Sequence, residues 1–142
     1  MNFLKIIVII CFALQPNEIM SQEIASYKWK NRILLVITED SLNTTFLNQI
    51  KELKNHESGL KERKLEVFLV TKEGFTLGLN NNSFKKNTEL YKNFNDTNAS
   101  FKAILIGLDG GVKLTQTDFI SCKKLFSIID VMPMRREEIK NN

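Results

Sequence analysis

Short apolar runs separated by polar segments indicate the buried strands of this chain. Residues 33–37, ILLVI, form an unbroken apolar run rich in β-branched side chains, which is typical of a strand covered on both faces. Residues 65–70, LEVFLV, and residues 101–108 are predicted to form two further strands. We expect the segments at 33–37 and 102–107 to lie side by side in the middle of one mixed sheet.

A helical pattern lies between the first two strands. Apolar side chains recur there every three or four positions up to about His56, which places them on one stripe of a helix. The stripe comprises Leu42, Phe46, Leu47, Ile50 and Leu53. Cap oxygens and negative charge precede it, at Glu39, Asp40 and Ser41. Gly59 is expected to end the helix, and the short links make the two strands parallel.

The last third of the chain is predicted to form a hairpin and a second helix. Asp109, Gly110 and Gly111 supply the positive backbone angles of a tight hairpin. A helix should then begin near Thr117 or Ser121 and end before Pro133, which cannot continue it. Its apolar stripe comprises Phe119, Cys122, Leu125, Phe126 and Ile129.

The order of these elements predicts an α/β fold. Strand, helix, strand, insert, strand, hairpin, strand and helix is the order of a thioredoxin-like core, a four-stranded mixed sheet with a helix on each face. Ferredoxin-like folds share parts of this order. Residues 71–100 are the variable insert, in which a short helix is expected to present Leu90, Tyr91 and Phe94 on one side.

The first residues have the pattern of a secretory signal peptide. Lys5 precedes a nine-residue apolar run, and a polar segment follows it. The run is shorter than the roughly 20 residues that cross a bilayer. We expect a signal peptide at 1–21 and one domain at 22–142, with Ala25 as a second cleavage site and a buried N-terminal element as the alternative. The protein would then be exported, periplasmic or secreted, with no transmembrane segment after signal removal.

The segment after the predicted cleavage site, residues 22–31, is mostly polar. We expect its aromatic pair, Tyr27 and Trp29, to lie against the domain.

Charge and cysteine content exclude several classes of function. The net charge of +4 comes from lysine and arginine mixed with acidic residues, which is typical of a solvated surface and not of a nucleic-acid interface. Once Cys11 is removed with the signal peptide, Cys122 is the one cysteine and no internal disulfide can form. His56 is the only histidine, so neither a metal site nor a cofactor is expected.

Several segments together resemble a known family. They are YKWKNRILLV at 27–36, Gln49, LKERKLEVFLV at 60–70, IGLDGGVKL at 106–114 and LFSIIDVMPMRREE at 125–138. This pattern, with its DGGVK and MPMRR motifs, resembles a domain of unknown function found in small exported bacterial proteins. The same domain, called peroxiredoxin-like P-DUDES, is found in sushi-repeat-containing and coiled-coil-domain-containing extracellular proteins of animals. Leu108 departs from the lysine that usually precedes the Asp-Gly pair. The resemblance implies a fold and export, but no settled activity.

Redox chemistry at the usual thioredoxin position is excluded by residue type. That chemistry needs a thiolate at the first turn of the helix after the first strand, and residues 38–45, TEDSLNTT, contain no cysteine. Cys122 is a weak catalytic candidate, either as a nucleophile at a helix start or as a small buried residue of an apolar stripe. We therefore favour a non-catalytic exported binding or interaction module. The alternative is a thiol-dependent, peroxiredoxin-like enzyme or redox sensor that uses Cys122.

A set of charged residues is the candidate binding surface. Arginine is preferred over lysine where a carboxylate or phosphate is held by a planar fork, so the ligand would be an unknown protein or an anion. The candidates are Arg32, Arg63, Asp109, Lys113, Asp130, Arg135 and Arg136. The alternative is that Asp130 pairs with an arginine and holds the C-terminal segment on the sheet.

Overall fold

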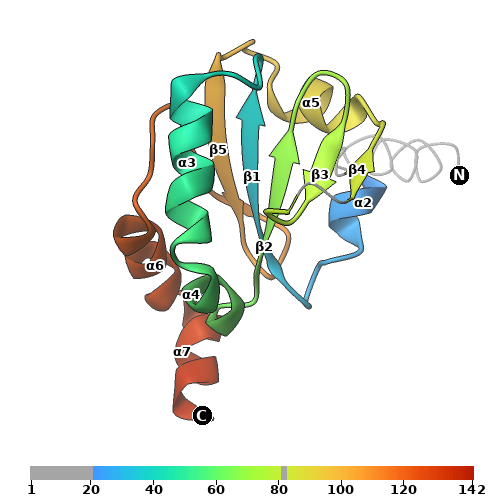
Figure 1. Ribbon diagram of the computed structural model, residues 1–142. Coiled ribbons are helices and arrows are strands. Elements are labelled where there is room, and N and C mark those ends of the chain that lie inside the picture. Colours follow the sequence, from blue (N-terminus) through green and yellow to red (C-terminus); the bar gives the residue numbers. More distant parts are fainter. Residues whose placement is uncertain (1–20, 81–82) are drawn as a thin grey trace, which may run out of the picture.

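The computed structural model describes residues 21–80 and 83–142, which build a six-stranded mixed sheet with helices on both faces (Figure 1). The strands are β1 (Arg32–Thr38), β2 (Leu65–Val70), β3 (Phe75–Leu77), β4 (Phe84–Lys85), β5 (Phe101–Ile106) and β6 (Val112–Gln116). Their order in the sheet is β4-β3-β2-β1-β5-β6. The α/β fold is confirmed, but the expected count of four strands is wrong. The insert at 71–100 adds β3 and β4 to one edge of the sheet.

Strand β1 lies in the centre of the sheet, as its apolar run predicted. It pairs in parallel with β2 and antiparallel with β5, so that Leu35 lies between Phe68 and Ile104. All seven residues of β1 are buried. The side-by-side placement of residues 33–37 and 102–107 is therefore confirmed.

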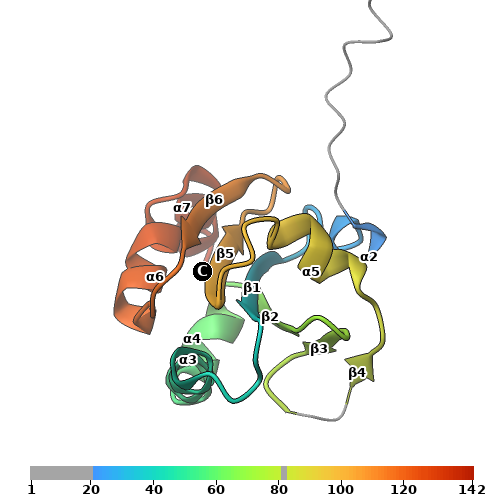
Figure 2. The same ribbon diagram turned by 90° about the horizontal axis from the view of Figure 1, so that it is seen from above.

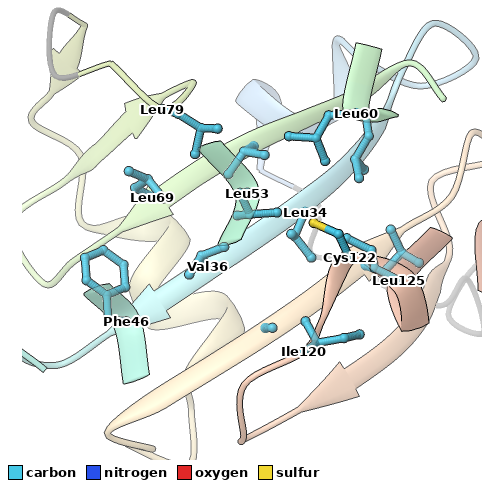
Figure 3. Close-up of a cluster of buried hydrophobic side chains, with 14 of the residues drawn as sticks. Leu34, Val36, Phe46, Leu53, Leu60, Leu69, Leu79, Ile120, Cys122 and Leu125 are labelled. Carbon is cyan, nitrogen blue, oxygen red and sulfur yellow. The ribbon is translucent and has the colours of Figure 1, made fainter. Parts of the chain in front are cut away.

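Successive side chains of β1 enter two different cores, because strand side chains alternate between the faces of a sheet. Leu34 and Val36 belong to one cluster of buried residues, which includes Leu53 and Leu125 from two helices (Figure 3). A second cluster fills the other face: Ile24, Ile33, Leu35, Ile37, Phe68, Val70, Phe75, Leu90, Tyr91, Ile104 and Ile106. A continuous apolar run is what this two-sided burial requires.

The helices divide between the two faces (Figure 2). One side carries α3 (Thr44–Lys54), α4 (Glu57–Glu62) and α6 (Cys122–Asp130), followed by α7 (Pro133–Lys140). The other side carries α2 (Gln22–Ala25) and α5 (Glu89–Phe94). Leu90 and Tyr91 of α5 are buried and Phe94 packs beside them, which confirms the short helix predicted within the insert.

The start of α3 differs from the prediction. Its N-cap is Asn43, whose side-chain oxygen accepts a hydrogen bond from the Phe46 amide at 3.0 Å. Asp40 instead closes a local turn by accepting from the Leu42 amide at 2.9 Å. Leu42 therefore precedes the helix and is 78% exposed, so its expected place on the apolar stripe is wrong. Leu47 of the same stripe is also exposed.

The prediction for Gly59 is wrong, whereas the predicted end of a helix before Pro133 is confirmed. Gly59 lies inside α4 and does not end a helix. A side chain there would meet the ring of Phe126, because a Cβ would lie 2.6 Å from one ring carbon. Helix α6 ends at Asp130, and Pro133 occupies the first turn of a new helix, where its missing amide hydrogen costs nothing.

Two aromatic predictions are also corrected. Phe119 precedes α6, which begins after its N-cap Ser121, and is 41% exposed. Tyr27 packs edge-on against Phe68, as expected, but Trp29 is 61% exposed and has a positive φ of 67°.

The predicted signal peptide at 1–21 lies, apart from Ser21, outside the described residues. Ser21 is the N-cap of α2. Among the described residues, no helix combines the length and apolar character needed to cross a bilayer.

A buried glutamine joins helix α3 to the segment that leads into α6. Gln49 is fully buried, and its side-chain amide donates to the Ile120 carbonyl and accepts from the Ile120 amide, both at 2.9 Å. This reciprocal pair of hydrogen bonds satisfies the amide and the carbonyl of Ile120, which lie outside the strands. A buried backbone group without a partner costs about 1–3 kcal/mol.

We expect Gln49→Leu to lower the free energy of unfolding by about 2–4 kcal/mol, because both groups of Ile120 lose their partner. Chemical denaturation would measure the loss. The control is Asn48→Ala, an exposed neighbour on the same helix, which should change stability by less than about 0.5 kcal/mol. Equal effects of the two substitutions would contradict this role of Gln49.

Candidate functional site

Asp130, at the end of α6, forms the centre of a charged cluster. Arg63, which follows α4, grips its carboxylate with two parallel bonds, Nε to Oδ1 at 2.9 Å and Nη2 to Oδ2 at 2.8 Å. Arg135 of α7 donates to the same carboxylate from Nε at 3.2 Å. These charge-assisted bonds lower the pKa of Asp130, and the bonds from Arg63 contribute most.

Two arginines of this cluster are almost completely buried. Arg135 is 2% exposed and also donates to the backbone and side chain of Glu62 and to Glu138. Arg32, at the start of β1, is 1% exposed, and its Nη1 donates to the Arg63 carbonyl at 2.8 Å and to Glu138 at 3.2 Å.

We call this set the arginine cluster: Arg32, Arg63, Arg135, Glu62, Asp130 and Glu138. Three guanidinium groups face three carboxylates, so the cluster is electrically balanced and binds α7 to the ends of α4, α6 and β1. The pairing of Asp130 with an arginine, one of the two alternatives for this residue, is what the structure contains.

Sequence reasoning missed Glu62 and Glu138. Glu138 lies three positions after Arg135, and that spacing would have indicated a pair if α7 had been predicted. Arg136, a predicted binding residue, is exposed and lies outside the cluster.

A pocket of about 340 Å³ separates the β5–β6 hairpin from the start of α7. Its lining comprises Arg32, Gly107, Leu108, Asp109, Lys113, Met132, Pro133 and Met134. The pocket therefore combines the hairpin tip with Met132, Pro133 and Met134 at the start of α7, two segments far apart in the sequence. We call it the hairpin pocket.

The rim of the hairpin pocket is held by an ion pair at the hairpin tip. Asp109 accepts from the Gly111 amide at 2.9 Å and from Lys113 at 2.8 Å, and the bond from Lys113 is the main cause of its lowered pKa. Of the three residues expected to supply positive backbone angles, Gly110 alone does so, with φ +82°. At Gly107 a Cβ would lie 2.6 Å from the Lys113 side chain, so the absence of a side chain leaves room for the lysine.

Arg32 contributes to the pocket a guanidinium group whose hydrogen-bond donors are only partly used. Its Nη1 carries the bonds to Arg63 and Glu138, while its Nε is buried and has no hydrogen-bond partner among the described residues. A buried polar atom without a partner is uncommon in folded proteins and calls for a reason. The structure thus brings three of the predicted binding residues, Arg32, Asp109 and Lys113, to one pocket.

Cys122, the weak catalytic candidate, is sealed in the core. It is 0% exposed, and its sulfur points among the aliphatic side chains of the α3 and α6 face (Figure 3). Burial, followed by the nearby Glu52 carboxylate, raises the pKa of this thiol to about 11, so it is protonated at neutral pH. Cys122 also lies at the start of α6, whereas a thioredoxin thiol is expected at the turn between β1 and α3.

Comparison with known proteins supports the fold and gives no activity. The sequence matches Domain of unknown function (DUF4174) over residues 23–138. No curated protein matches it. The fold is similar to that of a solved structure, the reduced 2-Cys peroxiredoxin of Plasmodium vivax, with a TM-score of 0.56 and 17% identity over 80% of this chain and 83% of the other. The resemblance to a domain of unknown function is thus confirmed, while the narrower P-DUDES assignment stays a prediction.

We expect Asp130→Asn to lower the free energy of unfolding by about 2 kcal/mol at pH 7, because Arg63 and the buried Arg135 lose a charged partner. The pKa of Asp130 is lowered in the folded state, so its contribution is present above the unfolded value near pH 4 and is lost as the pH falls through the folded value. The difference between the two proteins should therefore shrink in acid.

Urea unfolding at several pH values would test this prediction. The control is Asp118→Asn, which changes an exposed carboxylate outside the cluster. A stability difference that stays constant down to pH 2 would show that the Asp130 charge is not responsible.

Proposed function

The chain belongs to the family described as Domain of unknown function (DUF4174), and from its geometry we propose that it is a non-catalytic binding module on a thioredoxin-like scaffold. The observation that carries the proposal is the hairpin pocket, a largely apolar cavity whose charged lining residues are Arg32, Lys113 and Asp109. Pockets with apolar walls and a few placed polar groups are the usual form of ligand sites.

The walls of the hairpin pocket indicate the chemistry of its ligand. Met132, Pro133, Met134 and Leu108 offer apolar surface, and methionine adapts to irregular shapes. Lys113 and Arg32 offer positive charge from the hairpin and from the sheet. We propose a ligand that joins a small anionic group, such as a carboxylate, to an apolar body.

The Lys113 cation is available to such a ligand. Its pair with Asp109 is about one-third exposed on the lysine side and almost half exposed on the carboxylate side, and surface pairs of this kind contribute only about 0–1 kcal/mol. A ligand carboxylate can therefore replace Asp109 at little cost. The charge of the buried Arg32 is already paired with Glu138 at 3.2 Å, so Lys113 is the main cation for the ligand.

A thiol-dependent activity is the second candidate, and the surroundings of Cys122 argue against it. The thiolate is the reactive form of cysteine, and burial beside Glu52 opposes its formation. The turn between β1 and α3 offers no alternative sulfur.

We expect Cys122 to react with a thiol reagent only after unfolding. In the full chain carrying Cys11→Ser, native protein at pH 7 should react at least about a hundredfold more slowly than protein in denaturant, because the thiol is buried and protonated. The reaction would be followed with a chromogenic disulfide reagent. Rapid reaction of the native protein would contradict the burial of this thiol. Turnover of insulin disulfides or hydrogen peroxide that Cys122→Ser abolishes would establish the enzyme.

We expect hexanoate to bind in the hairpin pocket and its cationic counterpart hexylamine not to bind. Titration of the full chain should shift the backbone amide resonances of Gly107 and Lys113 in nuclear magnetic resonance spectra. Lys113→Gln should weaken hexanoate binding several-fold, because it removes one cation from the lining.

Lys123→Gln is the matched control, since this lysine is exposed on α6 and does not line the pocket. Equal shifts with hexylamine, or unchanged hexanoate binding by Lys113→Gln, would count against an anionic ligand at this place.

A further inference from the structure

The C-terminal end of α3 meets the N-terminal end of α6, and three side chains able to bind a metal gather at the junction. They are Glu52, His56 and Cys122, and one ligand atom from each lies within 4.8 Å of the others. The sequence predicted no companion for His56, because Cys122 is distant along the chain. Packing of α6 beside α3 brings them together.

Helix geometry positions each of the three groups. Glu52 and His56 are four residues apart, so they lie on the same side of α3 and its extension, with His56 Nδ1 3.8 Å from Glu52 Oε1. The other carboxylate contact is with α6, since Glu52 Oε1 accepts from the Cys122 amide at 2.9 Å. This bond holds the carboxylate beside the first residue of α6.

The imidazole nitrogen of His56 and the sulfur of Cys122 also share a contact with one backbone oxygen. The Glu52 carbonyl, in the last turn of α3, lies 2.8 Å from His56 Nδ1 and 3.8 Å from Cys122 Sγ. The imidazole nitrogen and the thiol sulfur therefore both lie beside this carbonyl oxygen. A metal ion bound by these two groups would replace their contacts with the Glu52 carbonyl.

We propose that Glu52, His56 and Cys122 form a zinc-binding site with one open coordination position. A thiolate sulfur, an imidazole nitrogen and a carboxylate oxygen are the three ligand types that zinc prefers, and three protein ligands leave room for a water or a ligand atom in a tetrahedral site. Magnesium and calcium prefer all-oxygen sites, so this donor set selects against them.

The charges at the junction suit a divalent ion. Zinc displaces the thiol proton to solvent, forming a sulfur–zinc bond with one proton released for each ion bound. Thiolate and carboxylate then neutralise the two positive charges of the ion, so the occupied site carries no net charge in its partly buried position.

Solvent reaches the junction from the side of α3. Cys122 is fully buried, but the side chain of His56 is 44% exposed and that of Glu52 is 23% exposed. Glu52 also lines a pocket of about 300 Å³ together with Asn48, Lys51, Asn55 and Phe119. The open coordination position can face this solvent side.

The test uses the full chain carrying Cys11→Ser, purified without a histidine tag. Zinc would be titrated by calorimetry and by competition with a chromophoric chelator, and cobalt would report the ligands through its thiolate charge-transfer absorption. We expect one ion per chain and one proton released per ion. His56→Gln and Glu52→Gln should each weaken binding by about tenfold or more, and Cys122→Ala should abolish the charge-transfer absorption.

Glu57→Gln is the control, because this carboxylate is exposed on α4 and lies outside the cluster. Its zinc affinity should equal that of the parent protein. If Cys122→Ala fails to fold, zinc binding by His56→Gln still tests the site, because His56 is half-exposed and its substitution should not disturb the core. Absence of one-to-one binding, or equal affinity of the parent and His56→Gln, would overturn the zinc site. The hexanoate experiment is independent of either outcome.

Discussion

Every side chain of strand β1 is buried, so this strand must be paired along both edges and covered on both faces. Strands β2 and β5 supply the two edges, and the two hydrophobic clusters cover the faces. The helices are consequently divided between the two sides of the sheet (Figure 2). The charged cluster lies at the start of β1, and the buried cysteine lies between two of the helices that cover one face.

The arginine cluster compensates the buried positive charge of Arg32, the first residue of β1. Arg32 begins the strand and is buried, and a buried cation is tolerated only when it is paired and hydrogen-bonded. Glu138 reaches it from α7, while Asp130 and Glu62 hold Arg63 and Arg135 around it. The cluster thereby fixes the start of α7 opposite the hairpin, and the space left between them is the hairpin pocket.

The junction of α3 and α6 places the sulfur in an unusual position for this fold. A thioredoxin-like enzyme needs its thiol at the exposed turn after β1, where a helix N-terminus stabilises the anion. Here that turn is capped by Asn43, and the one cysteine in the described part of the chain is packed under the far end of α3. The chain thus has a thioredoxin-like fold, but the turn where thioredoxin-like enzymes carry their thiol contains no cysteine.

The sequence by itself determined the elements whose signal is local. The apolar run at 33–37 is readable as a strand buried on both faces because each of its residues must avoid water. The hairpin at Asp109 to Gly111 and the Ser121 cap follow from the conformations that short-range hydrogen bonds favour. These signals sufficed for the thioredoxin-like fold. The seven candidate binding residues were chosen by their charge, and three of them, Arg32, Asp109 and Lys113, line the hairpin pocket.

The tertiary structure decided what depends on contacts between distant residues. A proline can end one helix and begin the next, and the sequence predicted only the first of these at Pro133. In the structure α7 also begins there, with Arg135 packed against Asp130 and Glu62. Glu52 and Cys122 show no relation along the chain, because the fold alone brings their helices together. The energy of such contacts depends on distance in space, and neither composition nor periodicity encodes that distance.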